Sequence, residues 1–359
     1  MRAELREPKS LGDSAALVGA VLLAPVSISG EGISKGSRID STLSIRLAEA
    51  ARDGRLTTAV RIGWIEQGEL HEDEAALRLA RAVAGPGLTI GPPRQSRVDL
   101  RAGTAGVLRV DVPGLGLINR IDPLEVFTLF HGQAVRAGQV VAAAKVAPHI
   151  VAEVAVAQAE KVAREASPIV AIAPYLPLEV AAIAAETLPP DGLQKFDSAA
   201  RKKVEGLGGR FIGTEAGLDD SAAGEAGGSA TRRLGQVLRA LAIERRVALI
   251  LVGGVSAGDP LSPFYEALAA LGGRVLRRGV PAHPGSMIWL AELGEATILG
   301  LPQCGMFSKA TAADLVLPRL LTGERVTPAL LADLGHGGLL GPEMRFRFPE
   351  YARDLESPE

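Results

Sequence analysis

Short apolar runs alternate with helix-type segments from about residue 168 to 320, and this alternation constrains the fold more than any other feature. Apolar runs of this length are typical of strands buried on both faces of a sheet. The pattern therefore predicts an α/β domain whose mostly parallel sheet is covered by helices on both faces, a three-layer αβα arrangement. The expected strands are PIVAIAP at 168–174, RFIG at 210–213, VALILVGG at 247–254, GRVLRRGV at 273–280 and ATILGLP at 296–302. The expected helices between and after them lie at 197–208, 229–246, 263–273 and 308–323.

The first half of the chain has a different rhythm. Helical spacing appears at 41–53, at 71–84 and near 151–166, with short strand-like runs between 95 and 147. An apolar stretch at 17–28 is shorter than the ~20 residues that a membrane span needs, so we expect a buried strand there. We predict a smaller α+β or β-rich N-terminal domain at 1–166, or two subdomains, then the α/β domain at 167–340 and a tail at 341–359.

Charge and cysteine content exclude several classes of protein. The formal net charge is −2 with no long block of like charge, which argues against nucleic acid as a partner. The single cysteine, Cys304, excludes an internal disulfide framework, and five scattered histidines show no zinc-ligand spacing. A cytoplasmic location is expected.

Three glycine-bearing segments should meet at the carboxyl edge of the predicted sheet, where open α/β sheets bind ligands. They are GGVSAGD at 253–259, AHPGSM at 282–287 and GLPQCGMFSKA at 300–310. Glycines admit close approach of a ligand, and Ser256 and the loop amides can donate to an anionic oxygen. Asp259 either accepts from a ligand N–H or holds Mg²⁺, or it caps the following helix. A helix beginning at Gly305 to Ser308 would offer amides to a phosphate.

These residues resemble a known family. GGVSAGD, the PG at 284–285 and the GLP at 300–302 are similar to the molybdopterin-binding domain shared by molybdopterin molybdotransferase, gephyrin and molybdopterin adenylyltransferase. GAVLLAP, HEDEAALRLARAVAG, AGVLRVDV and GLPQCGMFSKA also resemble molybdopterin-binding proteins that accompany molybdenum hydroxylases, over nearly the whole chain. The resemblance implies that molybdopterin or molybdenum cofactor is the ligand. The residues expected to bind it are Gly253, Gly254, Val255, Ser256, Ala257, Gly258, Asp259, His283, Pro284, Gly285, Gly300, Leu301, Pro302, Cys304 and Ser308.

Departures from the family pattern favour binding over catalysis. His283 and Ser286 stand where the molybdate-inserting enzymes carry lysines, and APYLPLE at 173–179 stands where they carry a TGDE-like first loop. Both molybdate insertion and adenylyl transfer need charged groups on phosphate or metal. We therefore expect a cofactor-binding protein in cofactor maturation or delivery, with a molybdoenzyme or a maturation protein as partner and a homo-oligomer as its form. Two alternatives stay open: an active nucleotidyl- or molybdate-transferase, and a scaffold or subunit contact without a ligand.

Overall fold

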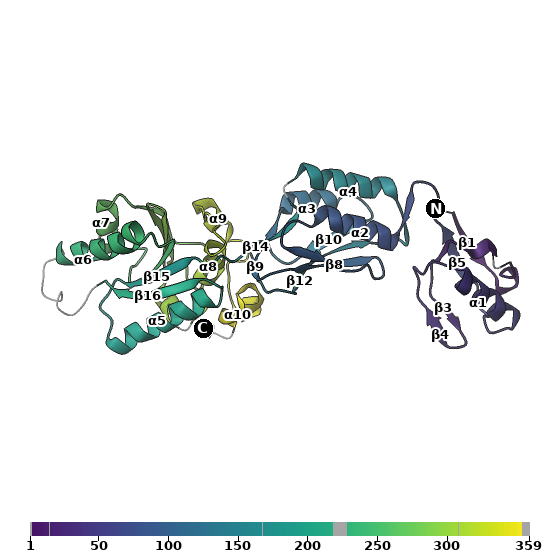
Figure 1. The fold of residues 1–359 in the computed structure, drawn as a ribbon, viewed down its shortest axis with the longest axis horizontal. Coiled ribbons are helices and arrows are strands. Elements are labelled where there is room, and N and C mark those ends of the chain that lie inside the picture. The colour runs from purple at the N-terminus through teal and green to yellow at the C-terminus, as the bar shows by residue number, and fades with distance from the viewer. Residues whose placement is uncertain (1, 14, 167, 218–227, 308, 354–359) are drawn as a thin grey trace. The chain divides into compact units, whose positions relative to one another are not determined.

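The computed structural model describes residues 2–13, 15–166, 168–217, 228–307 and 309–353 (Figure 1). Contacts divide the chain into two compact units. Unit 1 comprises Met1–Thr104, Arg109–His131 and Ala137–Ile172, and unit 2 comprises Ala105–Leu108, Gly132–Arg136 and Ala173–Glu359. The main division thus follows Ile172, whereas the sequence predicts a boundary after residue 166. In the part of the chain that the structure describes, no helix is long and apolar enough to cross a membrane.

The first part of unit 1 has a three-stranded sheet of order β1-β5-β2. Its strands are β1 (Arg2–Arg6), β2 (Ala20–Leu22) and β5 (Val60–Trp64), and α1 (Ser41–Arg52), which lies between β2 and β5 in the chain, contributes to the same core. The helix predicted at 41–53 is confirmed, and the Asp40 carboxylate caps it by accepting from the Leu43 amide at 2.7 Å. The single strand predicted at 17–28 is wrong. It is split into β2 and β3 (Val26–Ile28), with Pro25, which lacks an N–H, between them; β3 pairs with β4 (Glu31–Ile33).

The rest of unit 1 combines an antiparallel sheet with two packed helices. The sheet has the order β10-β12-β8-β7, formed by Leu124–Thr128, Val140–Val146, Arg97–Ala102 and Leu88–Ile90. The predicted helices are present as α2 (Glu72–Val83) and α4 (Glu153–Glu165). Arg78 of α2 joins them, because its guanidinium donates to Glu160 at 2.9 and 3.0 Å and to Glu153 at 2.7 Å. The shorter elements are β6 (Glu69–His71), β13 (Ile150–Ala152) and α3 (Val112–Ile118).

Unit 2 is built on a six-stranded sheet of order β16-β15-β17-β20-β19-β18. The strands are β15 (Glu179–Ala184), β16 (Arg210–Ala216), β17 (Leu249–Gly253), β18 (Arg274–Arg278), β19 (Trp289–Leu293) and β20 (Ala296–Gly300). β15 runs parallel to β16 and β17, and β17 runs parallel to β20. β19 is antiparallel to both of its neighbours, so β18 again points the same way as β20. The prediction of a mixed α/β fold is confirmed.

Two strands of this sheet escaped the sequence analysis, and one segment was assigned to it wrongly. PIVAIAP forms β14 (Val170–Pro174) in a separate sheet of order β11-β9-β14, with β9 at Gly106–Val110 and β11 at Ala134–Val135. The first strand of the six-stranded sheet is instead β15, EVAAIA, whose three alanines give little strand signal. β19 was also missed, because only a short turn separates it from β20.

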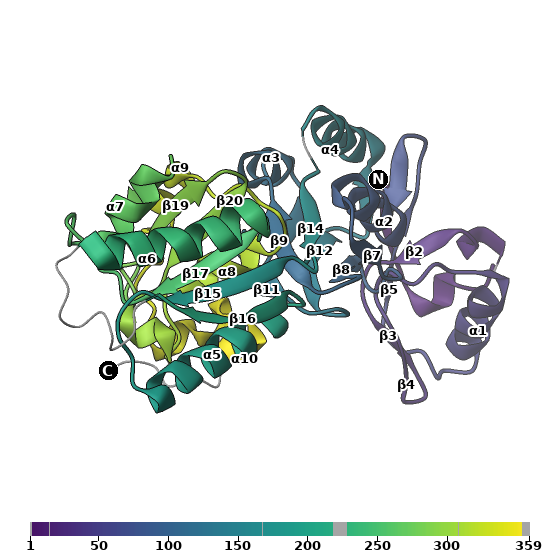
Figure 2. The ribbon, with the colours of Figure 1, turned by 60° about the vertical axis from the view of Figure 1, so that its left-hand side comes forward.

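Helices contribute to a separate apolar core on each face of the six-stranded sheet. Leu249 and Leu251 of β17 join one core, and Ile250 and Val252 join the other, as the two-residue period of a strand requires. Figure 2 shows α6 on one side of the sheet and α5 on the other. The helices are α5 (Pro190–Glu205) and α8 (Ala313–Leu320) in the first core, and α6 (Gly228–Leu238) and α7 (Pro263–Ala270) in the second.

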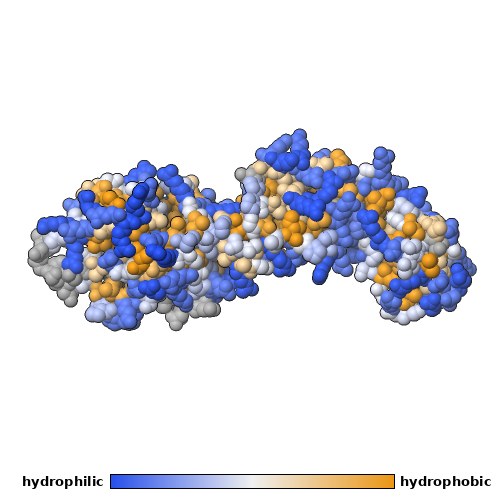
Figure 3. Space-filling view, in the orientation of Figure 1, coloured by the Kyte–Doolittle hydropathy of each residue, from blue (hydrophilic) through white to orange (hydrophobic). Residues whose placement is uncertain are grey.

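The helix α6 shows how the sequence selects its buried face. Leu234 and Leu238, four residues apart, are buried, while Arg232, Gln236 and Arg239 are exposed. A π-helical turn (Arg239–Glu244) continues it. Hydrophilic residues accordingly cover much of the visible face of unit 2 in Figure 3.

The segment predicted as a tail, 341–359, packs against the core of unit 2 in its described part. It forms a 3-10 helix (Pro342–Arg347) and α10 (Glu350–Arg353), and it is preceded by α9 (Pro328–Asp333). Phe348 and Ala352 are buried in the same core as α5. This segment therefore belongs to the folded unit.

A buried ion pair links α5 to α8. Lys203 Nζ lies 2.6 Å from Asp314 Oδ1, and the two side chains are 3% and 0% exposed. Removing one partner of such a pair leaves an uncompensated charge in the interior.

We expect Lys203→Met to lower the free energy of unfolding by about 3–5 kcal/mol, because it leaves the Asp314 carboxylate buried without its cation. Lys195→Met is the matched control on the same helix, since Lys195 pairs with Asp191 at 3.0 Å on the surface. Urea unfolding followed by circular dichroism measures both. Equal midpoints for the two variants would show that the buried pair contributes nothing.

Candidate functional site

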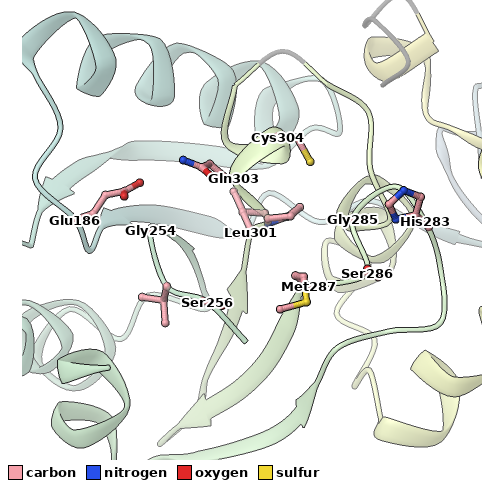
Figure 4. Close-up of a pocket in the computed structure, with 12 residues that line it drawn as sticks. Glu186, Gly254, Ser256, His283, Gly285, Ser286, Met287, Leu301, Gln303 and Cys304 are labelled. Carbon is pink, nitrogen blue, oxygen red and sulfur yellow. The ribbon is translucent and has the colours of Figure 1, made fainter. Parts of the chain in front are cut away.

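A cavity of about 590 Å³ lies at the carboxyl edge of the six-stranded sheet of unit 2 (Figure 4). Parallel strands end at the same edge, so the loops after β15, β17, β18 and β20 all reach it. Twelve residues from these four loops line the cavity: Glu186, Gly254, Val255, Ser256, His283, Gly285, Ser286, Met287, Leu301, Pro302, Gln303 and Cys304.

The structure brings together part of the set expected from the sequence. The expected residues that line the cavity are Gly254, Val255, Ser256, His283, Gly285, Leu301, Pro302 and Cys304. Six others stand beside these without lining it: Gly253 and Gly300, which end β17 and β20, and Ala257, Gly258, Asp259 and Pro284, which lie in the loops. Ser308 lies outside the described residues.

The end of β17 and the loop after it contain three glycines with different surroundings. Gly254 has φ +81°, and a Cβ there would come within 2.6 Å of Glu186 Cγ. A Cβ on Gly253 would collide with the Met306 side chain. Gly258 has neither constraint, since its nearest neighbour would be Met287 Cε at 3.5 Å and its φ is not positive. Of the three, Gly254 alone uses a left-handed backbone.

Hydrogen bonds within this loop, and one from Trp289 of β19, hold its backbone. The Gly258 amide donates to Ser256 Oγ at 3.1 Å, and the Leu261 amide donates to Asp259 Oδ1 at 3.0 Å. Asp259 thus closes a local turn, whereas the N-cap position of α7 belongs to Ser262. Trp289 Nε1, fully buried, donates to the Val255 carbonyl at 3.0 Å.

Tyr265 adds a further contact beneath the loop. Its hydroxyl donates to the Ser256 carbonyl at 3.2 Å, and the Arg278 guanidinium lies 3.9 Å from the centre of its ring. Burial raises the pKa of Tyr265 to about 12, while the positive charge of Arg278 opposes the shift. The hydroxyl therefore keeps its proton and remains a donor at neutral pH.

The loop after β18 is fixed through its backbone. The His283 amide donates to the Gly338 carbonyl at 2.7 Å, and the His283 carbonyl accepts from the Leu340 amide at 2.8 Å. Gly285 has φ +100°, and a Cβ there would lie 2.7 Å from Thr311 Cβ. The backbone is held on both sides while the His283 ring faces the cavity, where the described residues offer it no hydrogen-bond partner.

The loop after β20 does not open a long helix. Gln303–Met306 is a single 3-10 turn, and α8 begins only at Ala313. The predicted helix N-terminus at Gly305 to Ser308 is therefore wrong. Gly300 has no room for a side chain, because the Trp289 indole occupies that space, and Cys304 is half-buried in the cavity wall.

Glu186 is a residue of the cavity wall that the sequence analysis missed. The sequence analysis placed the first loop of the sheet at APYLPLE, but the loop that borders the cavity is AETLPP, after β15. This loop contains the acidic residue Glu186. Its carboxylate has no hydrogen-bond or ion-pair partner among the described residues. Figure 4 shows Glu186 and His283 at opposite ends of the group of lining residues. An apolar strand ending in Glu-Thr-Leu-Pro-Pro was the signal available for it.

Metal binding receives no support from the described side chains. No three His, Cys, Asp or Glu residues among them lie close enough together to hold a metal ion. Mg²⁺ at Asp259 thus stays a prediction from the sequence.

Comparison with known proteins gives a similarity to solved structures. No family model and no curated protein matches the chain. A solved structure, the molybdopterin biosynthesis MoeA protein from Pyrococcus horikosii, matches with 14% identity over 71% of this chain and 74% of that one, at a TM-score of 0.27. Because that score is low, we base the function on the residues of the cavity.

We expect Gly254→Ala to destabilise the protein by at least about 1–2 kcal/mol, the cost of a left-handed backbone at a residue with a Cβ. The new methyl group must also displace Glu186. Gly258→Ala is the matched control in the same loop, and its unfolding midpoint in urea should equal that of the wild type. A Gly254→Ala midpoint equal to the control would contradict the constraint at residue 254.

Proposed function

We propose that unit 2 binds molybdopterin or molybdenum cofactor in the cavity at the carboxyl edge of the sheet, as a cytoplasmic protein of cofactor maturation or delivery. One observation carries the proposal: residues of all three loops singled out in the sequence line the same cavity. The proposed partners are a molybdoenzyme or a maturation protein that gives or receives the cofactor.

The size and shape of the cavity fit such a ligand. Its volume of about 590 Å³ falls inside the range of small-molecule sites. Glycine turns at Gly254 and Gly285 keep side chains out of its wall, so backbone groups can approach a ligand closely.

The polar groups of the cavity favour one orientation of the ligand. A phosphate is repelled by the Glu186 carboxylate, whereas His283 and Ser286 are donors at the other end. The N–H groups of a pterin ring are donors that a carboxylate accepts well. We therefore place the pterin ring toward Glu186 and the phosphate toward His283 and Ser286.

Binding fits the cavity better than catalysis does. None of its twelve lining residues is Lys or Arg, and transfer of a phosphoryl or nucleotidyl group requires cationic groups or metal ions around the phosphates. An active molybdopterin transferase is the second candidate. The unpartnered carboxylate of Glu186 favours it, because a carboxylate in such a site can serve as a base or a metal ligand.

The proposal is tested by titrating the protein with molybdopterin and following Trp289 fluorescence in a Trp64→Phe background. We expect saturable binding that weakens about 10-fold in Glu186→Gln and in His283→Ala, since each loses a hydrogen bond to a charged or polar group of the ligand. Asp259→Ala, measured in parallel, tests the role of Asp259 in binding that the sequence predicts.

Glu292→Gln is the control for Glu186→Gln, because Glu292 lies on β19 near the opposite edge of the sheet and lines a separate cavity. Its affinity should equal that of the starting protein. Absence of binding to the unmutated cavity would reject the proposal and favour the scaffold alternative. Turnover of nucleotide with molybdopterin present would favour the transferase.

A further inference from the structure

The buried carboxylate of Asp314 collects donors from three separate segments of unit 2. Oδ1 accepts from Lys203 Nζ at 2.6 Å and from the Tyr351 hydroxyl at 2.8 Å, and Oδ2 accepts from the Thr311 amide at 2.8 Å. A fully buried carboxylate is tolerated only when its charge is paired and its lone pairs are occupied. Asp314 therefore ties α5, the start of α8 and the C-terminal α10 to one point.

Tyr351 is a permanent donor in this cluster. Burial, with the negative charge of Asp314 beside it, raises the pKa of Tyr351 well above its ordinary value. The hydroxyl stays protonated across the working pH range, and Lys203 Nζ lies 5.7 Å from the centre of its ring. Tyr351 lies in the segment 341–359, which the sequence analysis predicted to be a tail.

Thr311, whose amide donates to Asp314, also lies against two loops of the cavity. The Ala312 amide donates to the Pro284 carbonyl at 2.8 Å, and a Cβ on Gly285 would lie 2.7 Å from Thr311 Cβ. On the other side, a Cβ on Gly305 would lie 3.0 Å from Thr311 Oγ1. Thr311 thus packs against both loops without room for an added methyl group, so we expect a displacement of Thr311 to move both of them.

We propose that Tyr351 is a positioning residue of the cavity, which sets loops 283–286 and 301–305 through Asp314 and Thr311 without touching the ligand. The identity of that ligand rests on the proposed function, whereas the effect on the loops does not. The C-terminal segment thereby becomes part of the binding apparatus.

The single cysteine makes the loop geometry measurable without a ligand. Cys304 lies half-buried in the loop after β20, so the rate of its alkylation by iodoacetamide reports how well that loop is held. In Tyr351→Phe we expect alkylation to be about five-fold faster and molybdopterin affinity to be about five-fold weaker, less than the ~10-fold that a direct hydrogen bond to a charged acceptor contributes, because this bond lies outside the cavity. Both are measured at 25 °C on the folded full chain, with the melting temperature recorded separately.

Tyr175→Phe is the matched control. Tyr175 packs against the same core as Tyr351, and its hydroxyl has no hydrogen-bond partner within the described ranges. Neither the alkylation rate nor the affinity should change in this variant.

The outcomes separate this inference from the proposed function. A lower melting temperature in Tyr351→Phe with unchanged alkylation and affinity would mean a purely structural role and would overturn the inference. Faster alkylation in a protein whose wild type binds no molybdopterin would support the positioning role and reject the ligand. If the wild type binds molybdopterin and Tyr351→Phe changes both the alkylation rate and the affinity, the proposed function and the positioning role are both supported.

Discussion

Parallel pairing of β15, β17 and β20 is the constraint on which the rest of unit 2 depends. Parallel neighbours end at one edge, so three loops far apart in the chain must meet there. A strand in the middle of this sheet is buried on both faces and consists of apolar residues, as LILVG of β17 shows. Polar chemistry is thereby excluded from the sheet and confined to its loops, and the cavity follows from the topology.

Close packing then decides which loop positions must be glycine. The space above Gly254 is taken by Glu186, that above Gly285 by Thr311 and that above Gly300 by Trp289. Glu186 and Thr311 come from segments distant in sequence, whereas Trp289 comes from the neighbouring strand β19. The letters GG and PG therefore predict a turn, but the partner that forbids a side chain appears only once the sheet is assembled. Gly258 shows the limit of such inference, because it stands in the same loop with room for a methyl group.

The sequence predicted the elements with strong local signals and missed those whose assignment depends on distant contacts. β17, β20 and the four helices of the αβ region follow from apolar period and glycine stops. β14 has an equally good strand pattern, yet it pairs in another sheet, and no local property distinguishes the two outcomes. Because β15 is rich in alanine, its sequence does not indicate a strand. Glu186, in the loop after it, was therefore not predicted as a residue of the site. Phe348 and Tyr351 look like parts of a polar terminal segment, and only the structure shows that Phe348 is buried in the core and that Tyr351 packs against it.

Glu186 and Asp314 have the same carboxyl group in different surroundings. Three donors occupy the carboxylate of Asp314, so its hydrogen-bonding capacity is used up in holding the protein together. The carboxylate of Glu186 borders the cavity, and the described residues supply it with no donor. Water or a ligand must therefore solvate it, and a ligand that brings N–H groups replaces that water with better-placed hydrogen bonds. Because no Lys or Arg lines the cavity to hold a phosphate during transfer, we propose that the free carboxylate accepts from a donor-rich ring of the ligand.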